Sequence, residues 1–323
     1  MNRPEFNSIF AGEINTYLDY KVSSGYLEKS FYNHLRKFDR FCICHEVTKP
    51  LFTRQLAEEW IKRNDNEATT THYSRINAVK QFLIYISRKG YDVFVTRDIS
   101  FKHTDFQPYI YSDDEVQRYF LAVDTFDSTR NKKTKIQYPI LFRILYCCGT
   151  RINETLGIRK KDIDLEAGII KLFETKNDCE RYIVLGDDLS SLMRQYADKC
   201  FYLLNEDDYI FTNANGGRLI GDEIYEHHRL FLQKSGIAFR GNGEGPRIHD
   251  WRHRFSIYSF KQMIDAGIDM YVALPVLSTY LGHKTIFATE RYVRMTMNLF
   301  PYIENQFRDK LESIFGEADH ENN

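Results

Sequence analysis

The sequence predicts a mainly α-helical protein with a small β-sheet. Apolar residues recur at helical spacing in four segments of the first hundred residues, and further amphipathic segments fill the second half of the chain. Two short runs rich in β-branched and aromatic residues flank a polar turn, a pattern typical of a hairpin. With 323 residues, 43% of them hydrophobic, the chain is long enough for two domains with sizeable cores.

The first part of the chain is expected to form a four-helix domain over residues 1–95. Thr53 is placed to cap the third helix, and Gly90 follows the fourth. The expected helices cover residues 6–21, 30–44, 53–61 and 70–89. Residues 96–111 contain Pro108 and no helical pattern, which indicates a linker.

The second domain is expected over residues 112–300. Ser112 and Glu115 form a capping-box pattern that opens its first helix. The expected hairpin pairs residues 169–174 with 182–185, and the further helices cover 138–148, 189–204, 222–235, 249–264, 270–281 and 287–294. Pro275 is expected to interrupt the segment 270–281.

The tail at 301–323 is expected to form a last helix from about residue 302 to 315. Its apolar stripe comprises Ile303, Phe307, Leu311, Ile314 and Phe315. This stripe suits a contact with another protomer, and docking on its own domain is the alternative.

Composition excludes some classes of protein. No apolar run is long enough to span a membrane and no signal peptide is visible, so we expect a cytoplasmic protein with no membrane partner. The six cysteines do not have zinc-site spacing, and neither a metal nor another cofactor is expected. The net charge of −1 means that nucleic-acid binding would depend on local basic faces.

Five residues in a fixed order suggest chemistry at a phosphodiester. Arg151 follows an apolar helix, and His249, Arg252, His283 and Tyr292 come later in the chain. A phosphodiester resists attack because its oxygens are anionic, and arginines can hold those oxygens through paired N–H donors. A tyrosine can attack if cations and a proton acceptor lower the cost of forming its phenolate.

Each of these residues has a structural interpretation as well. An arginine after a helix is usually solvated, and any one of the 22 tyrosines usually packs in a core or on a surface. The combination and order of the residues favour the chemical interpretation. His253, which is adjacent to Arg252, is expected to face away from this group as a structural hydrogen-bonding residue.

Lys176 lies near the tip of the expected hairpin, where it would reach a DNA groove and protonate a leaving oxygen. Lys171 and Arg181 are nearby alternatives for that role. The sequence has no phosphate-binding loop of the ATPase type and no cluster of carboxylates suited to magnesium near these residues. These absences disfavour ATP hydrolysis and a two-metal nuclease.

These motifs together strongly resemble the tyrosine recombinase, or phage integrase, family. The matching segments are 149–154 (Gly-Thr-Arg-Ile-Asn-Glu), 175–176 with 181–185, 249–253 (His-Asp-Trp-Arg-His), and 281–283 (Leu-Gly-His) with 289 and 292. The resemblance implies a helical, SAM-like core-binding domain followed by an α+β catalytic domain. The segment after Gly267 is longer than the family pattern.

The resemblance also implies roles for the residues. Tyr292 would attack the scissile phosphate and form a 3′-phosphotyrosyl bond, while Arg151, Arg252 and His283 stabilise the transition state. His249 would assist proton transfer, Lys176 would be the general acid, and Glu154 would support the site by orienting an arginine.

The implied partner is double-stranded DNA with specific recombination sites, on which the protein assembles as a tetramer and passes through a Holliday junction. Accessory DNA-bending or recombination factors are possible partners. Integration or excision of a mobile element is the favoured role. The alternatives are Xer-type resolution of chromosome dimers, a type IB topoisomerase, and a catalytically inactive DNA-binding relative.

Overall fold

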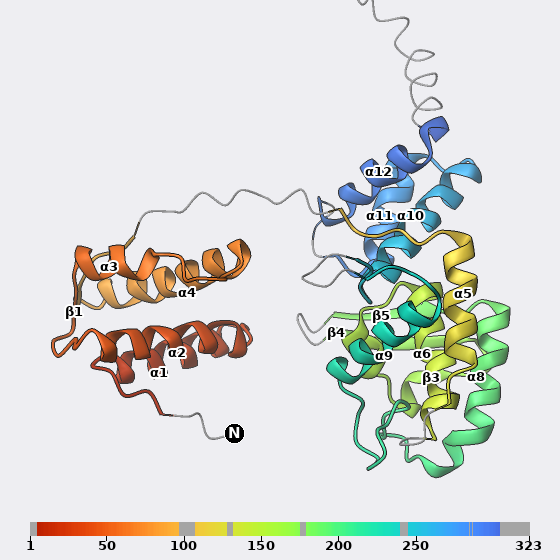
Figure 1. Cartoon of the computed structure of the whole chain (residues 1–323), viewed down its shortest axis with the longest axis horizontal. Coiled ribbons are helices and arrows are strands. Elements are labelled where there is room, and N and C mark those ends of the chain that lie inside the picture. The colour runs from red at the N-terminus through yellow and green to blue at the C-terminus, as the bar shows by residue number, and fades with distance from the viewer. Residues whose placement is uncertain are drawn as a thin grey trace, which may run out of the picture. The chain divides into compact units, whose positions relative to one another are not determined.

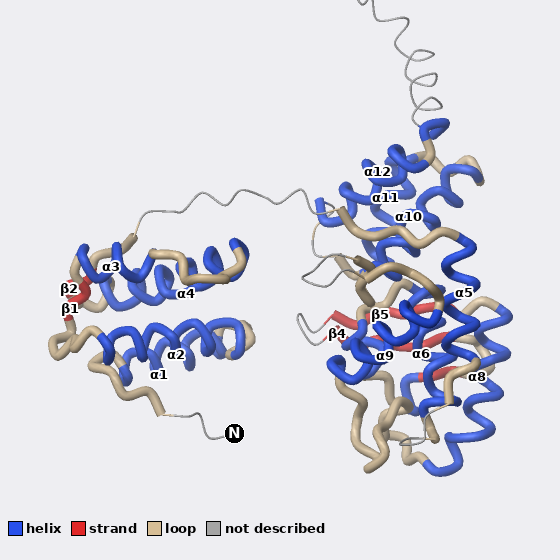
Figure 2. The backbone as a smooth tube through the Cα atoms, viewed as in Figure 1, coloured by secondary structure: helices blue, strands red, loops and turns tan. Residues whose placement is uncertain are grey.

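Helices dominate the computed structural model of the chain, and the strands are few and short (Figure 2). The structure describes residues 5–96, 107–127, 132–174, 179–239, 245–283, 285 and 287–303. The chain divides into two compact units, residues 1–106 and 107–323, and each has its own core. None of the described helices combines the length and the apolar character needed to cross a bilayer.

The first unit is a four-helix bundle with one short parallel strand pair (Figure 1). Its elements are α1 (Ala11–Ser23), α2 (Lys29–Cys44), β1 (Leu51–Phe52), α3 (Arg54–Ile61), α4 (Thr69–Ser87) and β2 (Asp92–Val93). Thr53 caps α3 as expected, since its hydroxyl accepts a hydrogen bond from the backbone N–H of Leu56. Aromatic side chains fill the core, with Phe38 in edge contact with Phe52 and Trp60.

The second unit contains the remaining helices and a three-stranded antiparallel sheet. Its helices are α5 (Asp113–Asp124), α6 (Thr134–Cys148), α7 (Ile152–Leu156), η1 (Lys160–Asp162), α8 (Asp187–Cys200), η2 (Phe201–Leu203), α9 (Gly221–Lys234), α10 (Asp250–Asp265), α11 (Met270–Leu281) and α12 (Phe287–Leu299). Its strands are β3 (Ile163–Asp164), β4 (Ile169–Glu174) and β5 (Cys179–Val184), in the order β3-β4-β5. The capping box of Ser112 and Glu115 is present at the start of α5.

Helix α11 corrects one expectation, because Pro275 does not interrupt it. Pro275 is the sixth residue of this twelve-residue helix, and its missing N–H removes the bond to the carbonyl of Tyr271 while the helix continues on both sides. Tyr271 is 77% exposed, so this turn of the helix lies at the surface, where water can satisfy a carbonyl that loses its intrahelical bond. The expected tail helix lies almost entirely in residues 304–323, outside the described residues, and only its first part, including the buried Ile303, is described.

Helices α10, α11 and α12 lie together at one end of the second unit (Figure 1) and share a core of their own. Leu277 and Leu281 of α11 pack there with Ile257 of α10 and with Tyr292 of α12. The motif segments at 249–253, 281–283 and 289–292 are therefore carried by one packed cluster of helices.

Candidate active site

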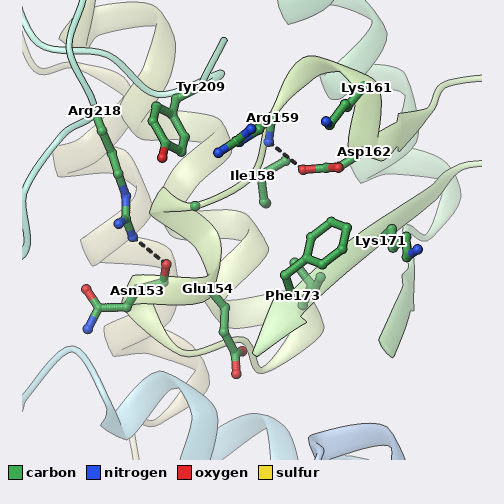
Figure 3. A pocket seen from close by; sticks show the side chains of 12 residues that line it. Asn153, Glu154, Ile158, Arg159, Lys161, Asp162, Lys171, Phe173, Tyr209 and Arg218 are labelled. Atoms are coloured by element: carbon green, nitrogen blue, oxygen red, sulfur yellow. Dashed lines mark hydrogen bonds between the residues drawn. The ribbon is translucent and has the colours of Figure 1, made fainter. Parts of the chain in front are cut away.

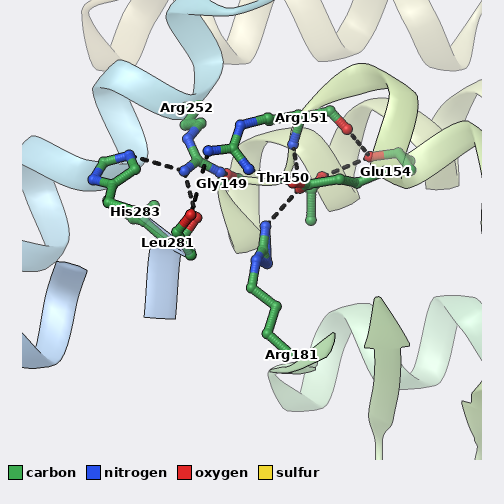
Figure 4. Close-up of polar contacts among 10 residues, drawn as sticks. Gly149, Thr150, Arg151, Glu154, Arg181, Arg252, Leu281 and His283 are labelled. Atoms are coloured by element: carbon green, nitrogen blue, oxygen red, sulfur yellow. Dashed lines mark hydrogen bonds and ion pairs between the residues drawn. The ribbon is translucent and has the colours of Figure 1, made fainter. Parts of the chain in front are cut away.

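Arg252 is the centre of the candidate site (Figure 4). It lies in the first turn of α10 and is 1% exposed. Its Nη1 donates to the carbonyl of Gly149 at 2.8 Å, and its Nη2 donates to the carbonyl of Leu281 at 2.6 Å. Burial, followed by the like charge of Arg151, lowers the pKa of Arg252 to about 10, so the guanidinium remains charged at neutral pH. A single arginine thus joins the end of α6 to the end of α11.

Two glycines shape the turns that Arg252 joins. Gly149 and Gly282 end α6 and α11 in the left-handed conformation, with φ of 59° and 66°. A Cβ atom on Gly149 would lie 2.2 Å from a ring carbon of Phe255, so this position requires glycine for space as well as for conformation. The turns direct the carbonyls of Gly149 and Leu281 toward one guanidinium.

His283 is held beside Arg252 in a defined protonation state. Its Nε2 lies 3.1 Å from Nη2 of Arg252, and its Nδ1 lies 2.7 Å from the hydroxyl of Thr289. Because a guanidinium only donates, Nε2 must accept, and the neutral ring carries its proton on Nδ1 and donates to Thr289. Burial, followed by the charges of Arg252 and Arg151, lowers the pKa of His283 to about 4. The ring is therefore neutral at pH 7.

Tyr292 lies in α12 against two imidazoles. Its ring is 4% exposed and stacks on that of His283, with centroids 6.1 Å apart and planes inclined by 11°. The ring of His253 lies on another side, with its centroid at 5.5 Å. The structure therefore brings Tyr292 close to the same group of side chains as Arg252.

Arg151 is the second arginine of the site, and the carboxylate of Glu154 holds it in place (Figure 4). Arg151 precedes α7, and its Nη1 donates to Oε1 of Glu154 at 2.6 Å while its backbone N–H donates to Oε2 at 2.8 Å. Its Nη2 lies 3.5 Å from the carbonyl of Gly282. Arg151 and Arg252 therefore both reach the turn that carries His283.

His249 and His253 form a pair at the start of α10. His249 is the residue before the helix, and its ring meets that of His253 edge to face, with centroids 4.9 Å apart. Burial and the nearby arginines, Arg252 first, lower the pKa of His249. The expectation that His253 faces away is wrong, because His253 lies one helical turn after His249 and contacts Tyr292.

Lys176 and Arg181 both belong to the hairpin that the sequence predicts, but the structure places only Arg181. Lys176 lies outside the described residues. Arg181, which the sequence offered only as an alternative to it, points into the protein and donates from Nη2 to Oε2 of Glu154 at 2.6 Å. A signal for this existed, since Arg181 shares the strand parity of the buried Ile183 while Tyr182 is exposed.

A cavity on the hairpin side of α7 is a separate feature (Figure 3). It is lined by basic side chains that include Arg159, Lys171 and Arg218, and Arg218 donates to the carbonyl of Asn153 at 2.7 Å. Two residues considered in the sequence line this cavity, Glu154 and Lys171, and Lys171 pairs with Glu180 at 2.6 Å. Among the described residues, no group of three or more His, Cys, Asp or Glu side chains is placed to hold a metal ion.

Comparison with known proteins identifies the family. The model of the phage integrase family matches residues 112–298, more than half of the chain. A putative integrase/recombinase of Sinorhizobium fredii is 25% identical over 294 residues, which are 88% of this chain and 93% of that protein. The tyrosine recombinase XerD of Oceanobacillus iheyensis is 26% identical over 244 residues, 73% of this chain and 75% of that protein.

Solved structures show the same fold. The XerH site-specific recombinase in a post-cleavage complex with a palindromic difH substrate has a TM-score of 0.66 at 18% identity, covering 87% of this chain and 80% of that chain. A lambda integrase tetramer bound to a Holliday junction has a TM-score of 0.59 at 16% identity, covering 89% of this chain and 78% of that chain. The chain belongs to the phage integrase family and is a tyrosine-type DNA recombinase.

Proposed function

We propose that this protein cleaves and rejoins DNA at specific sites through a 3′-phosphotyrosyl bond to Tyr292. The observation that carries the proposal is the position of Tyr292, which is buried against the neutral ring of His283 while His283 is bonded to Arg252. No other tyrosine in the described residues combines these partners with the sequence order of the motifs. A phenol in this position can approach a phosphate that the two arginines hold.

The proposed cleavage exchanges one phosphoester for another. The phenol oxygen of Tyr292 bonds to phosphorus, the bond from phosphorus to the 5′-oxygen breaks, and the phenol loses a proton while the 5′-oxygen gains one. Rejoining is the reverse reaction, with a 5′-hydroxyl of the partner strand as the nucleophile. Because the phosphotyrosyl bond conserves the energy of the phosphodiester, the exchange itself requires no nucleotide fuel.

Arg151 and Arg252 are the proposed ligands of the non-bridging phosphate oxygens. Charged, preorganised donors stabilise the charge that develops in the transition state without rearranging during the reaction. His283 assists them as a neutral ring, and His249 is the proposed group for proton transfer at the phenol. Glu154 orients Arg151, to which it is already bonded in the structure.

Lys176 is the proposed general acid for the leaving 5′-oxygen. This assignment rests on its position in the sequence between β4 and β5 and on the family pattern. The first unit, expected at residues 1–95, is the proposed core-binding domain. We propose that residues 112–300 bind and cut the DNA and that the tail at 301–323 contacts another protomer.

The proposed partner is double-stranded DNA with specific sites, acted on in the cytoplasm by a tetramer. The solved relatives support it, because XerH is bound to a difH substrate and a lambda integrase tetramer is bound to a Holliday junction. Integration or excision of a mobile element is our first choice of role. The XerD relative supports chromosome-dimer resolution as the second. Inverted repeats immediately beside the gene would favour the first role.

Trapping the covalent bond tests the proposal. Sites bound by the full chain would be selected from a random DNA pool, and a nick placed near the cleaved phosphate would let the freed end diffuse away. We expect the unaltered protein to form an adduct that survives denaturation. Tyr292→Phe should bind the same DNA with the same Kd and form none. An adduct formed by Tyr292→Phe at the unaltered rate would contradict the assignment.

A further inference from the structure

Arg181 has an unusual environment for a buried arginine. Its side chain is 8% exposed, and its Nη2 donates to Oε2 of Glu154 at 2.6 Å. Its Nε and Nη1 are buried without a hydrogen-bond partner among the described residues. Buried donors of a charged group are normally paired, since leaving one unpaired costs ~1–3 kcal/mol or more.

Another buried ion pair of the chain provides a contrast. Arg75 in the first unit is 3% exposed, and its Nε and Nη2 both donate to Glu67 while Nη1 donates to the carbonyl of Trp60. Every nitrogen of that guanidinium has a partner, as expected of a pair that serves the fold. Arg181 lacks this saturation, so stabilising the fold does not by itself explain its placement.

The partner of Arg181 is shared with Arg151. Oε1 of Glu154 accepts from the side chain of Arg151, and Oε2 accepts from the backbone N–H of Arg151 and from Arg181. Burial opposes the charge of Glu154, but Arg181 and then Arg151 hold the pKa of this carboxyl below its usual value. With Oε2 occupied in this way, Oε1 is the oxygen that accepts from the guanidinium of Arg151, whose Nη2 lies 3.5 Å from the carbonyl of Gly282.

We infer that Arg181 is a positioning residue for DNA cleavage, which acts through Glu154 on Arg151. This inference rests on the proposed function and deepens it. Arg181 fixes the rotation of the Glu154 carboxylate, and the carboxylate fixes the guanidinium of Arg151. Because Arg181 belongs to β5, it also couples the β4–β5 hairpin to the site. The group is compact, and the charge of Arg181 reaches both Arg252 and His283.

Removing Arg181 should therefore slow the chemical step more than it weakens binding. In Arg181→Met the Glu154 carboxylate is free to rotate and to bind Arg151 with both oxygens, which draws that guanidinium away from the phosphate. We expect the single-turnover rate of adduct formation by the full chain to fall roughly 10- to 100-fold, which is typical when a residue that orients a directly contacting group is lost. The Kd for the same selected DNA should stay within about 3-fold, since the DNA contacts themselves are kept.

Two further variants separate positioning from folding. Arg143→Met removes a partly buried arginine that is paired with Asp124 through both oxygens in the same unit, and it should leave the rate unchanged. Arg181→Lys keeps a charge near Glu154 and should restore part of the rate. If lysine gives no more activity than methionine while both proteins bind DNA, the inference fails.

A double variant covers the case in which Arg181→Met does not fold. The combination of Glu154→Gln and Arg181→Met leaves neither buried charge unpaired. If Arg181 acts through Glu154, this double variant and Glu154→Gln alone should form the adduct at equal rates. A further loss in the double variant would overturn the inference. A wild-type protein that forms no adduct would instead contradict the proposed function, whereas a wild-type adduct with an equal rate for Arg181→Met would contradict this inference alone.

Discussion

The proton on Nδ1 of His283 determines what that ring can offer a phosphate. Arg252 requires Nε2 to accept, and the hydroxyl of Thr289 receives the proton on Nδ1. Thr289 is fully buried, so water does not compete for this bond. The ring therefore has one orientation and one tautomer before any substrate binds, and Thr289 is the residue that selects them.

Replacing Thr289 by valine should slow DNA cleavage with little change in packing, because the two side chains have nearly the same shape. One lost hydrogen bond of ~1 kcal/mol corresponds to a roughly 5-fold slower adduct formation. Single-turnover trapping on nicked DNA would measure it. Thr296→Val is the matched control, since Thr296 is also buried in α12 but bonds to the backbone carbonyl of Tyr292. Equal rates for Thr289→Val and the unaltered protein would rule out this role of Thr289.

The sequence was informative about individual residues when a motif carried several of them. Arg151, Arg252, His283 and Tyr292 were singled out by their order, and the structure places them together. It was less informative about His253 and Arg181. Their positions depend on which side of a helix or strand faces the protein interior, which the motif does not state.

At the level of elements, the turn between α6 and α7 connects the fold to the site. Gly149 ends α6, its carbonyl accepts from Arg252, and Arg151 follows two residues later. The conformation of this one glycine therefore sets the position of both arginines.

Gly149→Ala should destabilise the second unit and slow cleavage. Left-handed alanine costs ~1 kcal/mol, and the clash with Phe255 adds ~1–3 kcal/mol. Gly267→Ala is the matched control, because Gly267 also follows a helix with φ of 81° and has nothing within 4 Å of an added Cβ. Urea unfolding should give a loss of ~1 kcal/mol for the control and clearly more for Gly149→Ala. Equal losses would contradict the steric argument.

Long elements were predictable from the sequence and the shortest ones were not. Helices α2 and α4 begin and end within two residues of their expected limits. The parallel strands β1 and β2 were missed because two residues each cannot show a strand period, and their pairing joins segments on either side of α3 and α4. The interruption expected at Pro275 was wrong because the helix continues through this proline, whose lost bond falls on an exposed turn.

At the level of the whole molecule, several histidines are neutral at physiological pH because they are enclosed. Burial is the largest cause for His228 and His253, and it lowers their pKa values to about 3 and about 2. An unfolded chain has histidine pKa values of ~6.5. Above that pH neither state binds a proton and the stabilisation is complete. Below it the unfolded state alone gains protons, so stability falls as the pH is lowered.

The free energy of unfolding should therefore decrease between pH 7 and pH 5. Each such histidine contributes a slope of up to ~1.4 kcal/mol per pH unit once the pH is below its unfolded pKa. Urea unfolding at several pH values would measure the slope. His228→Asn removes one linked group and should make the slope shallower, with the other histidines unchanged. A stability that is constant over this range would contradict the account.

The helical patterns and the segment 96–111 indicated a boundary, and the units divide between residues 106 and 107. Target DNA cannot be named in the same way, because base recognition depends on which side chains reach the grooves. The motifs indicate the family and its chemistry, but they do not indicate which DNA sequence the protein recognises.

Locating the covalent bond tests the central claim most directly. The adduct of the full chain on nicked DNA would be digested with nuclease and trypsin and examined by mass spectrometry. We expect the nucleotide phosphate on the peptide that contains Tyr292, between Arg291 and Arg294. A phosphate found on a different residue, such as Tyr280 of the neighbouring helix, would contradict the claim.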